Sequence, residues 1–384
     1  MSIKGKAFIA GAYEHPDRLM PDKTITQLHA EVAMGALTDA GLSLKDVDGF
    51  AHVGGDITMP GIALADYLGL KLSYVDSTVT GGSSPVYHVG HAAAAIATGK
   101  CQVVLVTLAN RPRSAVARRV QGEAPEYPFE ALYGTSTLGM YALAAQRHMY
   151  EYGTTSAQLA EVKVAAAHHA QYNPHALLPK PVTVEDVLNS RMMSDPLHLL
   201  DCCVVTDSGG AVVVVSPEVA RDLKRQSVKI LSQAESPKHT MNGQVDLTYT
   251  GARWTGPRAF EDAGLKPSDI DYASIYDSFT ITVVETIEDL GFCEKGQGGR
   301  FVLDGALQAP HGKLPFNTDG GGLCNNHPGM GGITKIIEAV RQLRGEAAKE
   351  VQVPNCHLAL AHGTGGSLGT RMGSATLILG QEDA

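Results

Sequence analysis

The pattern of apolar and polar positions predicts that strands and helices alternate along most of the chain. An amphipathic helix is expected to end at Gly41, and a polar turn separates it from a strand that begins after Asp48. The same pattern appears again, with a helix that ends at Gly264 and a strand that follows Asp271. The two glycines are 223 positions apart, and so are the two aspartates. One supersecondary unit is therefore used twice.

Each copy of this unit is followed by a second helix with a glycine-rich start. In the first copy, residues 80–85 open a helix that reaches about Thr98, and in the second, residues 329–332 open the helix 333–343. A continuous apolar run at residues 211–215 is typical of a buried strand. Strands and helices that alternate in two related halves predict an α/β protein in which two sheets pack around shared helices.

The repeat also predicts how the chain is divided. We expect two pseudo-symmetric halves, residues 1–230 and 231–384, of which the first carries a mainly helical insertion at about 108–200. The polarity of the insertion favours a surface lid over a part of the core. Two-fold symmetric homodimers are the commonest assemblies of such proteins, so we expect a homodimer.

Composition and charge exclude several classes of partner. The net charge of -9 and the absence of Lys/Arg runs argue against nucleic acid and against an anionic membrane surface. No segment approaches the roughly 20 apolar residues of a membrane span, and the start lacks a signal-peptide stretch, so we expect a cytoplasmic protein. The six cysteines are scattered without CxxC spacing, which indicates neither a disulfide scaffold nor a metal site.

Two longer motifs carry a resemblance to a known family. Residues 191–203, which lead into the Thr-Asp-Ser-Gly-Gly-Ala run at 206–211, are similar to the end of an insertion domain. Residues 317–322, followed by Asn-His-Pro-Gly at 326–329, are similar to a catalytic histidine loop. The chain resembles the thiolase superfamily, and within it the sterol-carrier-protein type thiolases. This resemblance implies a five-layered αβαβα thiolase fold with an inserted loop domain. It also implies an acyl-CoA substrate, with coenzyme A as part of the substrate, no covalently bound cofactor and no metal.

The resemblance breaks at the residue that gives thiolases their nucleophile. The family has a cysteine just before the first-half helix, and an ungapped count from that helix assigns this slot to Gly82. A count anchored on the glycine-serine run assigns the slot to Val79 instead, and neither residue is a nucleophile. Cys101 lies beyond the far end of the helix, and the pair Cys202 and Cys203 is expected to be structural. We therefore predict that no acyl-cysteine forms.

Other positions that match the family's catalytic loops keep reactive side chains. The resemblance implies that His327 acts as a base, and that Tyr276, in a Tyr-Asp-x-Phe motif, acts as an acid, a base or an oxyanion donor. Passive structural roles for both residues stay open. His362 stands where true thiolases have a second cysteine and sterol-carrier-protein type relatives have histidine, so the resemblance implies that it is a catalytic residue too. Backbone N–H groups near Gly82 and Thr364 are expected to hold the thioester oxygen.

These residues fit a reaction that needs no covalent acyl-enzyme. Retro-aldol cleavage of a 3-hydroxyacyl-CoA requires only a base for the hydroxyl and donors for the enolate oxygen. The chain resembles the thiolase-like steroid side-chain aldolases, which lack the cysteine and work with a small zinc-ribbon and OB-fold partner protein. It departs from them at Asn326-His327, where a second tyrosine is expected. Two alternatives stay open: an acyltransferase or thiolase that works by an atypical route or with a partner subunit, and a non-catalytic acyl-CoA-binding scaffold subunit.

Overall fold

The structure is a computed structural model that describes residues 2–55, 57–115, 132, 136–238, 246–368 and 372–382. In the first half its elements are β1 (Phe8–Glu14), α1 (Ile25–Ala40), η1 (Leu44–Asp46), β2 (Gly49–Val53), α2 (Pro60–Leu68), β3 (Tyr74–Asp76), η2 (Gly81–Ser83), α3 (Ser84–Ala97), β4 (Val103–Asn110), β7 (Ser208–Val215) and α8 (Pro217–Asp222). The insertion contributes α5 (Thr137–Tyr152), α6 (Ser156–Ala170), α7 (Val184–Asn189), β5 (Met192–Ser194), β6 (Leu197–His198) and η4 (Leu199–Asp201). The second half contains β8 (Val228–Lys238), α9 (Ala252–Ala263), η5 (Pro267–Asp269), β9 (Tyr272–Ile275), α10 (Thr280–Asp289), α11 (Gly298–Phe301), α12 (Gly321–Cys324), α13 (Gly332–Arg344), β10 (Leu358–Gly366) and β11 (Met372–Gly380).

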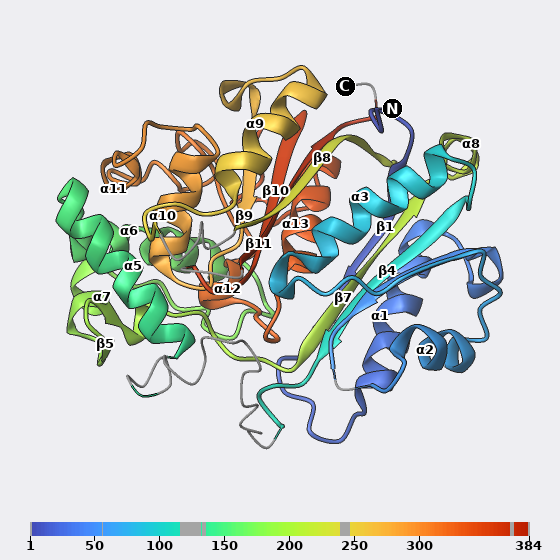
Figure 1. Ribbon diagram of the computed structural model, residues 1–384, viewed down its shortest axis with the longest axis horizontal. Helices are drawn as coiled ribbons and strands as arrows, with labels where there is room; N and C mark the ends of the chain where they lie inside the picture. Colours follow the sequence, from blue (N-terminus) through green and yellow to red (C-terminus); the bar gives the residue numbers. More distant parts are fainter. Residues whose placement is uncertain are drawn as a thin grey trace.

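These elements are arranged in five layers (Figure 1). Helix α1 covers β1, β4 and β7 on one outer side, and α9 covers β8 and β11 on the other. Helices α3 and α13 lie in the middle, because α3 contacts β2 and β4 as well as β8 and β10, and α13 contacts β7 and β1 as well as β9 and β10. The sequence-based prediction of an αβαβα thiolase fold is confirmed.

The expectation of two separate sheets needs a correction. Among the described residues, nine strands form one sheet in the order β3-β2-β4-β7-β1-β8-β11-β10-β9. The two halves join through a short antiparallel contact in which Phe8 pairs with Lys229 and Ile9 with Val228. Each half would otherwise present an unpaired strand at this edge, and the contact satisfies part of that edge.

The internal repeat is visible in matching local contacts. The carboxylate of Asp48 accepts hydrogen bonds from the N–H groups of residues 102–103, at the start of β4. Asp271 accepts the equivalent bonds from residues 357–358, at the start of β10, at 2.8 and 2.9 Å. Both strands run parallel to the strand that follows the aspartate. These contacts support two related halves, although the predicted boundary at 230/231 falls inside β8, so the division stays a proposal.

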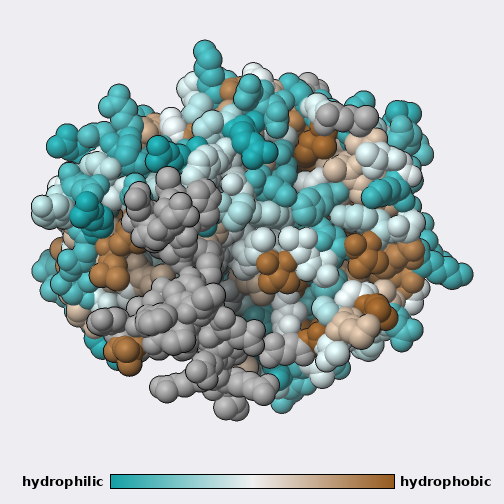
Figure 2. Space-filling view, viewed as in Figure 1, coloured by the Kyte–Doolittle hydropathy of each residue, from teal (hydrophilic) through white to brown (hydrophobic). Residues whose placement is uncertain are grey.

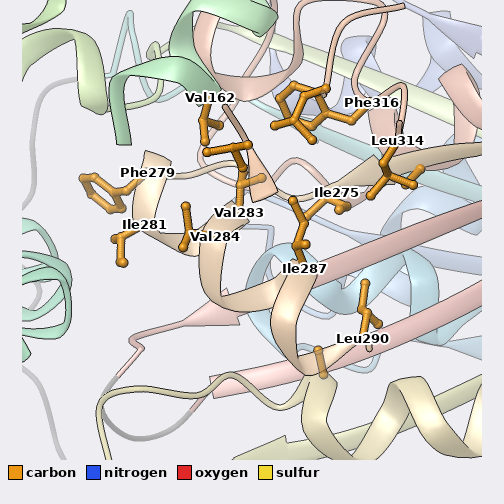
Figure 3. Close-up of a cluster of buried hydrophobic side chains, with 14 of the residues drawn as sticks. Val162, Ile275, Phe279, Ile281, Val283, Val284, Ile287, Leu290, Leu314 and Phe316 are labelled. Atoms are coloured by element: carbon orange, nitrogen blue, oxygen red, sulfur yellow. The ribbon is translucent and has the colours of Figure 1, made fainter. Parts of the chain in front are cut away.

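The insertion packs against the second half instead of forming a surface lid. Part of the predicted 108–200 segment, residues 116–131 and 133–135, lies outside the described residues. In the remainder, Tyr141, Leu159 and Val162 are at most 2% exposed and belong to the core cluster of the second half. Figure 3 shows Val162 with side chains of α10, including Val283. The lid prediction is wrong because α6, whose residues are mostly Ala, Val and Leu, buries them against the second half, although the insertion as a whole is polar.

No helix within the described ranges combines the length and the apolar character that crossing a membrane requires.

Candidate active site

Tyr276 and His327 come together although they are 51 positions apart in the sequence. Tyr276 directly follows β9, and His327 lies in the loop between α12 and α13. The phenol oxygen Oη is 2.8 Å from Nε2 of His327. The two rings meet edge to face, with centroids 5.6 Å apart. Two residues that were predicted separately therefore form one hydrogen-bonded pair.

The local environment sets the protonation states of both side chains. Burial raises the pKa of the Tyr276 phenol well above its usual value, and the neighbouring Cys203 and Tyr141 add to the shift. Burial also lowers the pKa of His327 to about 4, an effect that Asp277 opposes. At neutral pH the phenol is therefore protonated and the imidazole is neutral. In the tautomer of His327 that carries its proton on Nδ1, Nε2 accepts the hydrogen bond and the Tyr276 hydroxyl donates it.

Gly82, one of the two positions predicted for the nucleophile slot, has no room for a side chain. It lies in η2, directly before α3, and a Cβ added to it would be 2.4 Å from the Oη atom of Tyr276 and 2.5 Å from the carbonyl oxygen of Thr364. Any side chain at this position would collide with the phenol. The phenol therefore occupies the space that a nucleophile at position 82 would need.

The oxyanion role expected for backbone N–H groups near Gly82 and Thr364 stays a prediction. The carbonyl oxygen of Thr364, which is a hydrogen-bond acceptor, approaches Gly82, and its side-chain Oγ1 is buried without a partner among the described residues. Gly363 and Gly365 turn their Cα atoms toward η2 and α3, where an added Cβ would meet Ser83 and Thr80. This close approach requires glycine on the face of β10 that meets η2.

His362 holds Tyr276 through its backbone, since its carbonyl oxygen accepts the N–H of Tyr276 at 3.0 Å, but its side chain contacts other partners. Its Nδ1 atom lies 2.9 Å from the hydroxyl of Thr376 and its Nε2 atom 3.2 Å from the hydroxyl of Ser374. Thr376 in turn contacts Thr255 on α9, at 2.8 Å. Because neighbouring residues of a strand point to opposite faces, His362 points toward α9 while Gly363 points toward η2. Burial lowers its pKa to about 3, and we assign it a structural position.

A cavity lies on the side of Met330, and neither Tyr276 nor His327 is among its lining residues. Its volume is about 380 Å³, and it lies where the chain leaves β2 and β4. It is lined by Ile25, Val53, Gly54, Gly55, Val79, Asn110, Arg111, Ala115 and Met330. Met330 precedes Gly331, and a Cβ added to Gly331 would be 3.3 Å from the Tyr276 ring and 3.4 Å from the His327 ring. Met330 is thus the lining residue of the cavity that is nearest to the pair along the chain.

Asp277, the next residue of the tyrosine motif, takes part in a buried ion pair. The sequence did not reveal this pair. Lys335 of α13 contacts Asp277 at 2.9 Å, and both side chains are 1% exposed. Asp277 also accepts hydrogen bonds from the N–H groups of residues 322–323. Burial acts to lower the pKa of Lys335, but the carboxylates of Asp277 and Asp319, with a smaller effect of Glu14, together raise it, so the amine stays charged. The ion pair ties the tyrosine strand to the histidine loop and to α13.

Comparisons with known proteins give the same family for both halves. Residues 234–381 match the family model described as "Thiolase C-terminal domain-like". An acetyl-CoA acetyltransferase of Methanothermobacter thermautotrophicus is 35% identical, over 91% of this chain and 93% of that protein. A steroid side-chain-cleaving aldolase of Thermomonospora curvata is 36% identical, over 91% and 93%. This chain belongs to the thiolase family. The solved structure of an "Ltp2-ChsH2(DUF35) aldolase" has a TM-score of 0.89 and 34% identity, and 99% of each chain is covered.

In this thiolase-family chain, three cysteines that lie outside the predicted nucleophile slot are poorly suited to act as nucleophiles. Burial raises the pKa of Cys203 to about 12, and the pKa values of Cys202 and Cys101 to about 11. The thiolate is the reactive form of cysteine, and these shifts suppress it at neutral pH. The described residues also contain no group of three or more His, Cys, Asp or Glu side chains arranged to hold a metal ion.

Proposed function

We propose that this thiolase-family enzyme cleaves a 3-hydroxyacyl-CoA by a retro-aldol reaction, without an acyl-cysteine. The observation that carries the proposal is the Tyr276–His327 hydrogen bond at the position where Gly82 leaves no room for a nucleophile. A base in contact with a proton-relaying hydroxyl is what retro-aldol cleavage needs, whereas thiolytic cleavage needs a residue that stores the acyl group. The relatives that are named as aldolases support the same choice.

The proposed reaction uses the hydrogen bond as it stands. The substrate hydroxyl gives its proton to Oη of Tyr276, while the phenol proton passes to Nε2 of His327. The carbon bearing the hydroxyl becomes a carbonyl, and the electron pair of the broken carbon-carbon bond moves onto the thioester as an enolate. The enolate then takes up one proton at carbon, which balances the proton lost by the hydroxyl. Coenzyme A stays attached to the shorter thioester throughout.

A second candidate is acyl transfer, which the similarity to an acetyl-CoA acetyltransferase favours. The two candidates differ in their need for free coenzyme A. Incubation of the protein with a 3-hydroxyacyl-CoA should release a shorter acyl-CoA and a free aldehyde or ketone in equal amounts, without added coenzyme A. Incubation with acetyl-CoA should leave the protein mass unchanged. Products that form only when free coenzyme A is added, or an acetyl adduct on a cysteine, would support acyl transfer instead.

The proposal extends to the parts of the substrate, to a partner protein and to the location of the enzyme. Coenzyme A would enter as part of the substrate, and the cavity beside Met330 would receive the group that leaves as the carbonyl product. We propose that the enzyme works with a small zinc-ribbon and OB-fold partner protein, because the name of the similar solved structure joins two proteins. The turnover assay is therefore run with and without such a partner. A cytoplasmic location fits the six cysteines, all of which are free thiols.

A homodimer is supported by the surface of the first half. Strand β3 lies at an edge of the sheet and pairs only with β2 among the described strands. Figure 2 shows hydrophobic side chains exposed on the right, the side on which α2 lies in Figure 1. The exposed apolar residues of this region are Met59, Ile62, Tyr67, Val75 and Val79. An open edge strand beside apolar side chains favours association. Light scattering should give about twice the chain mass of 40.5 kDa, and a monomer mass at micromolar concentration would refute the dimer.

A further inference from the structure

The loop that carries His327 is held from the other half of the molecule by a buried carboxylate. Glu14 is the last residue of β1, and its side chain is 4% exposed. Its Oε1 atom accepts hydrogen bonds from Asn325 at 3.1 Å and from Asn326 at 2.9 Å. These two asparagines directly precede His327, 311 and 312 positions from Glu14. One carboxylate oxygen therefore binds two consecutive residues of the histidine loop.

Two arginines keep this carboxylate charged and fixed in place. Arg18 donates to Oε1 of Glu14 at 2.8 Å, and Arg341 of α13 donates to Oε2 at 3.3 Å. Burial acts to raise the pKa of Glu14, but Arg18 and Arg341 together lower it below its usual range. A charged acceptor makes stronger hydrogen bonds to amide donors than a neutral one does. The Glu14 side chain is therefore ionised at neutral pH and binds the two asparagines as a charged acceptor.

From Asn326 the contacts continue to the backbone of His327. The Oδ1 atom of Asn326 accepts a hydrogen bond from the Thr206 hydroxyl at 2.7 Å. That hydroxyl oxygen accepts the N–H of His327 at 3.0 Å, and the N–H of Thr206 donates to the His327 carbonyl at 3.3 Å. Both N–H and C=O of His327 are thus held by one residue, and Asn326 links this residue to Glu14. The imidazole can keep its 2.8 Å contact with Tyr276 only while this backbone stays in place.

We propose that Glu14 is a positioning residue that sets the place of His327 through Asn326 and Thr206. This role rests on the proposed use of the Tyr276–His327 pair in catalysis. Glu14 touches neither member of the pair, and it lies in the first half while the pair belongs to the second. Activity would therefore depend on how the first half, which carries Glu14, is positioned against the second half, which carries the pair. A misplacement of about 1 Å at a reacting group can cost on the order of 100-fold in rate.

The test compares Glu14→Gln with Glu338→Gln in the full-length protein. Glu338 is similarly buried and also contacts Arg341, at 3.2 Å, but its other hydrogen bond goes to Thr318, nine positions before His327, and not to the two asparagines that directly precede His327. Glu14→Gln should lower kcat by about 10- to 100-fold and leave KM within about two-fold, whereas Glu338→Gln should leave kcat near that of the wild type. In a His327→Ala background, Glu14→Gln should cause no further loss, because residues that act through one another are not additive. A further loss by the same factor would refute positioning through His327.

Amide hydrogen exchange provides a readout that needs no substrate. The amide of His327 should exchange faster in Glu14→Gln than in the wild type or in Glu338→Gln, since its acceptor Thr206 is released. Should Glu14→Gln fail to fold, Asn326→Ala removes the link while the contacts of Glu14 with the two arginines remain, and it should give the same two effects. Unchanged exchange in the loop would overturn the proposal whether or not the protein proves to be an aldolase. Faster exchange with no retro-aldol activity in the wild type would keep the positioning role and reject the proposed reaction.

Discussion

Replacement of His327 by alanine should lower the turnover of a 3-hydroxyacyl-CoA by about 100- to 10,000-fold, the usual range for loss of a general base. The variant removes the acceptor that lies 2.8 Å from the Tyr276 phenol, so the substrate proton has no onward path. Tyr276→Phe keeps the ring that fills the space beside Gly82 but removes the hydroxyl. It should also lose activity and still bind acyl-CoA. Steady-state kinetics together with equilibrium binding of a non-hydrolysable acyl-CoA measure both effects.

The pH dependence separates a role in proton transfer from a role in shape alone. Because burial lowers the pKa of His327 to about 4, the imidazole is neutral and able to accept a proton across the neutral range. Turnover in the wild type should therefore stay level as the pH falls from 8 to about 5 and drop as His327 becomes protonated. His362→Gln serves as the control, since the pKa of that histidine is also lowered by burial but its ring is bonded to hydroxyls on the α9 side. If His327→Ala and Tyr276→Phe cleave a competent substrate at the wild-type rate, the scaffold hypothesis becomes the better one.

The layers of the fold could be predicted from the sequence because the repeat consists of short patterns of neighbouring residues. A helix that ends at a glycine and a strand that follows an aspartate are recognisable within about a dozen residues, and both copies form as expected. The union of the two sheets was missed, since it depends on a contact of two residue pairs between β1 and β8 that lie more than 200 positions apart. Patterns along the chain carry no information about such a contact.

The candidate site was predicted in part, and the errors have physical reasons. Tyr276 and His327 were identified from motifs, but their hydrogen bond depends on how α13 and β9 pack. His362 was assigned to the site by resemblance alone. The sequence His-Gly-Thr-Gly at 362–365 could have corrected this assignment, because on a strand the two glycines share one face and the histidine lies on the other. The glycine face is the one that meets η2. Glu14 and Lys335 gave no signal, because a charged residue in a polar-apolar pattern looks solvent-exposed until its partners are known.

The second large effect concerns stability and involves Lys335. Its amine and the Asp277 carboxylate are both 1% exposed and 2.9 Å apart. Removal of one partner from a buried ion pair leaves an uncompensated charge and typically costs about 3 to 5 kcal/mol. Lys335→Met should therefore lower the free energy of unfolding by about that amount, measured by urea denaturation at pH 7. Lys23→Met, which breaks the more exposed pair with Glu31, should cost at most about 1 kcal/mol.

The double variant Asp277→Asn/Lys335→Met distinguishes the ion pair from a simple loss of volume. With both charges removed, no buried charge is left unpaired, and the cost should be clearly less than the sum of the two single variants. The amide that Asp277→Asn introduces would still offer one oxygen to the N–H groups of residues 322–323, which the carboxylate binds at 2.8 and 3.1 Å in the wild type. An additive double variant would mean that Lys335 stabilises α13 through its aliphatic stem and not through its charge. Non-additivity would identify the ion pair as the contact that fixes the tyrosine strand to the histidine loop.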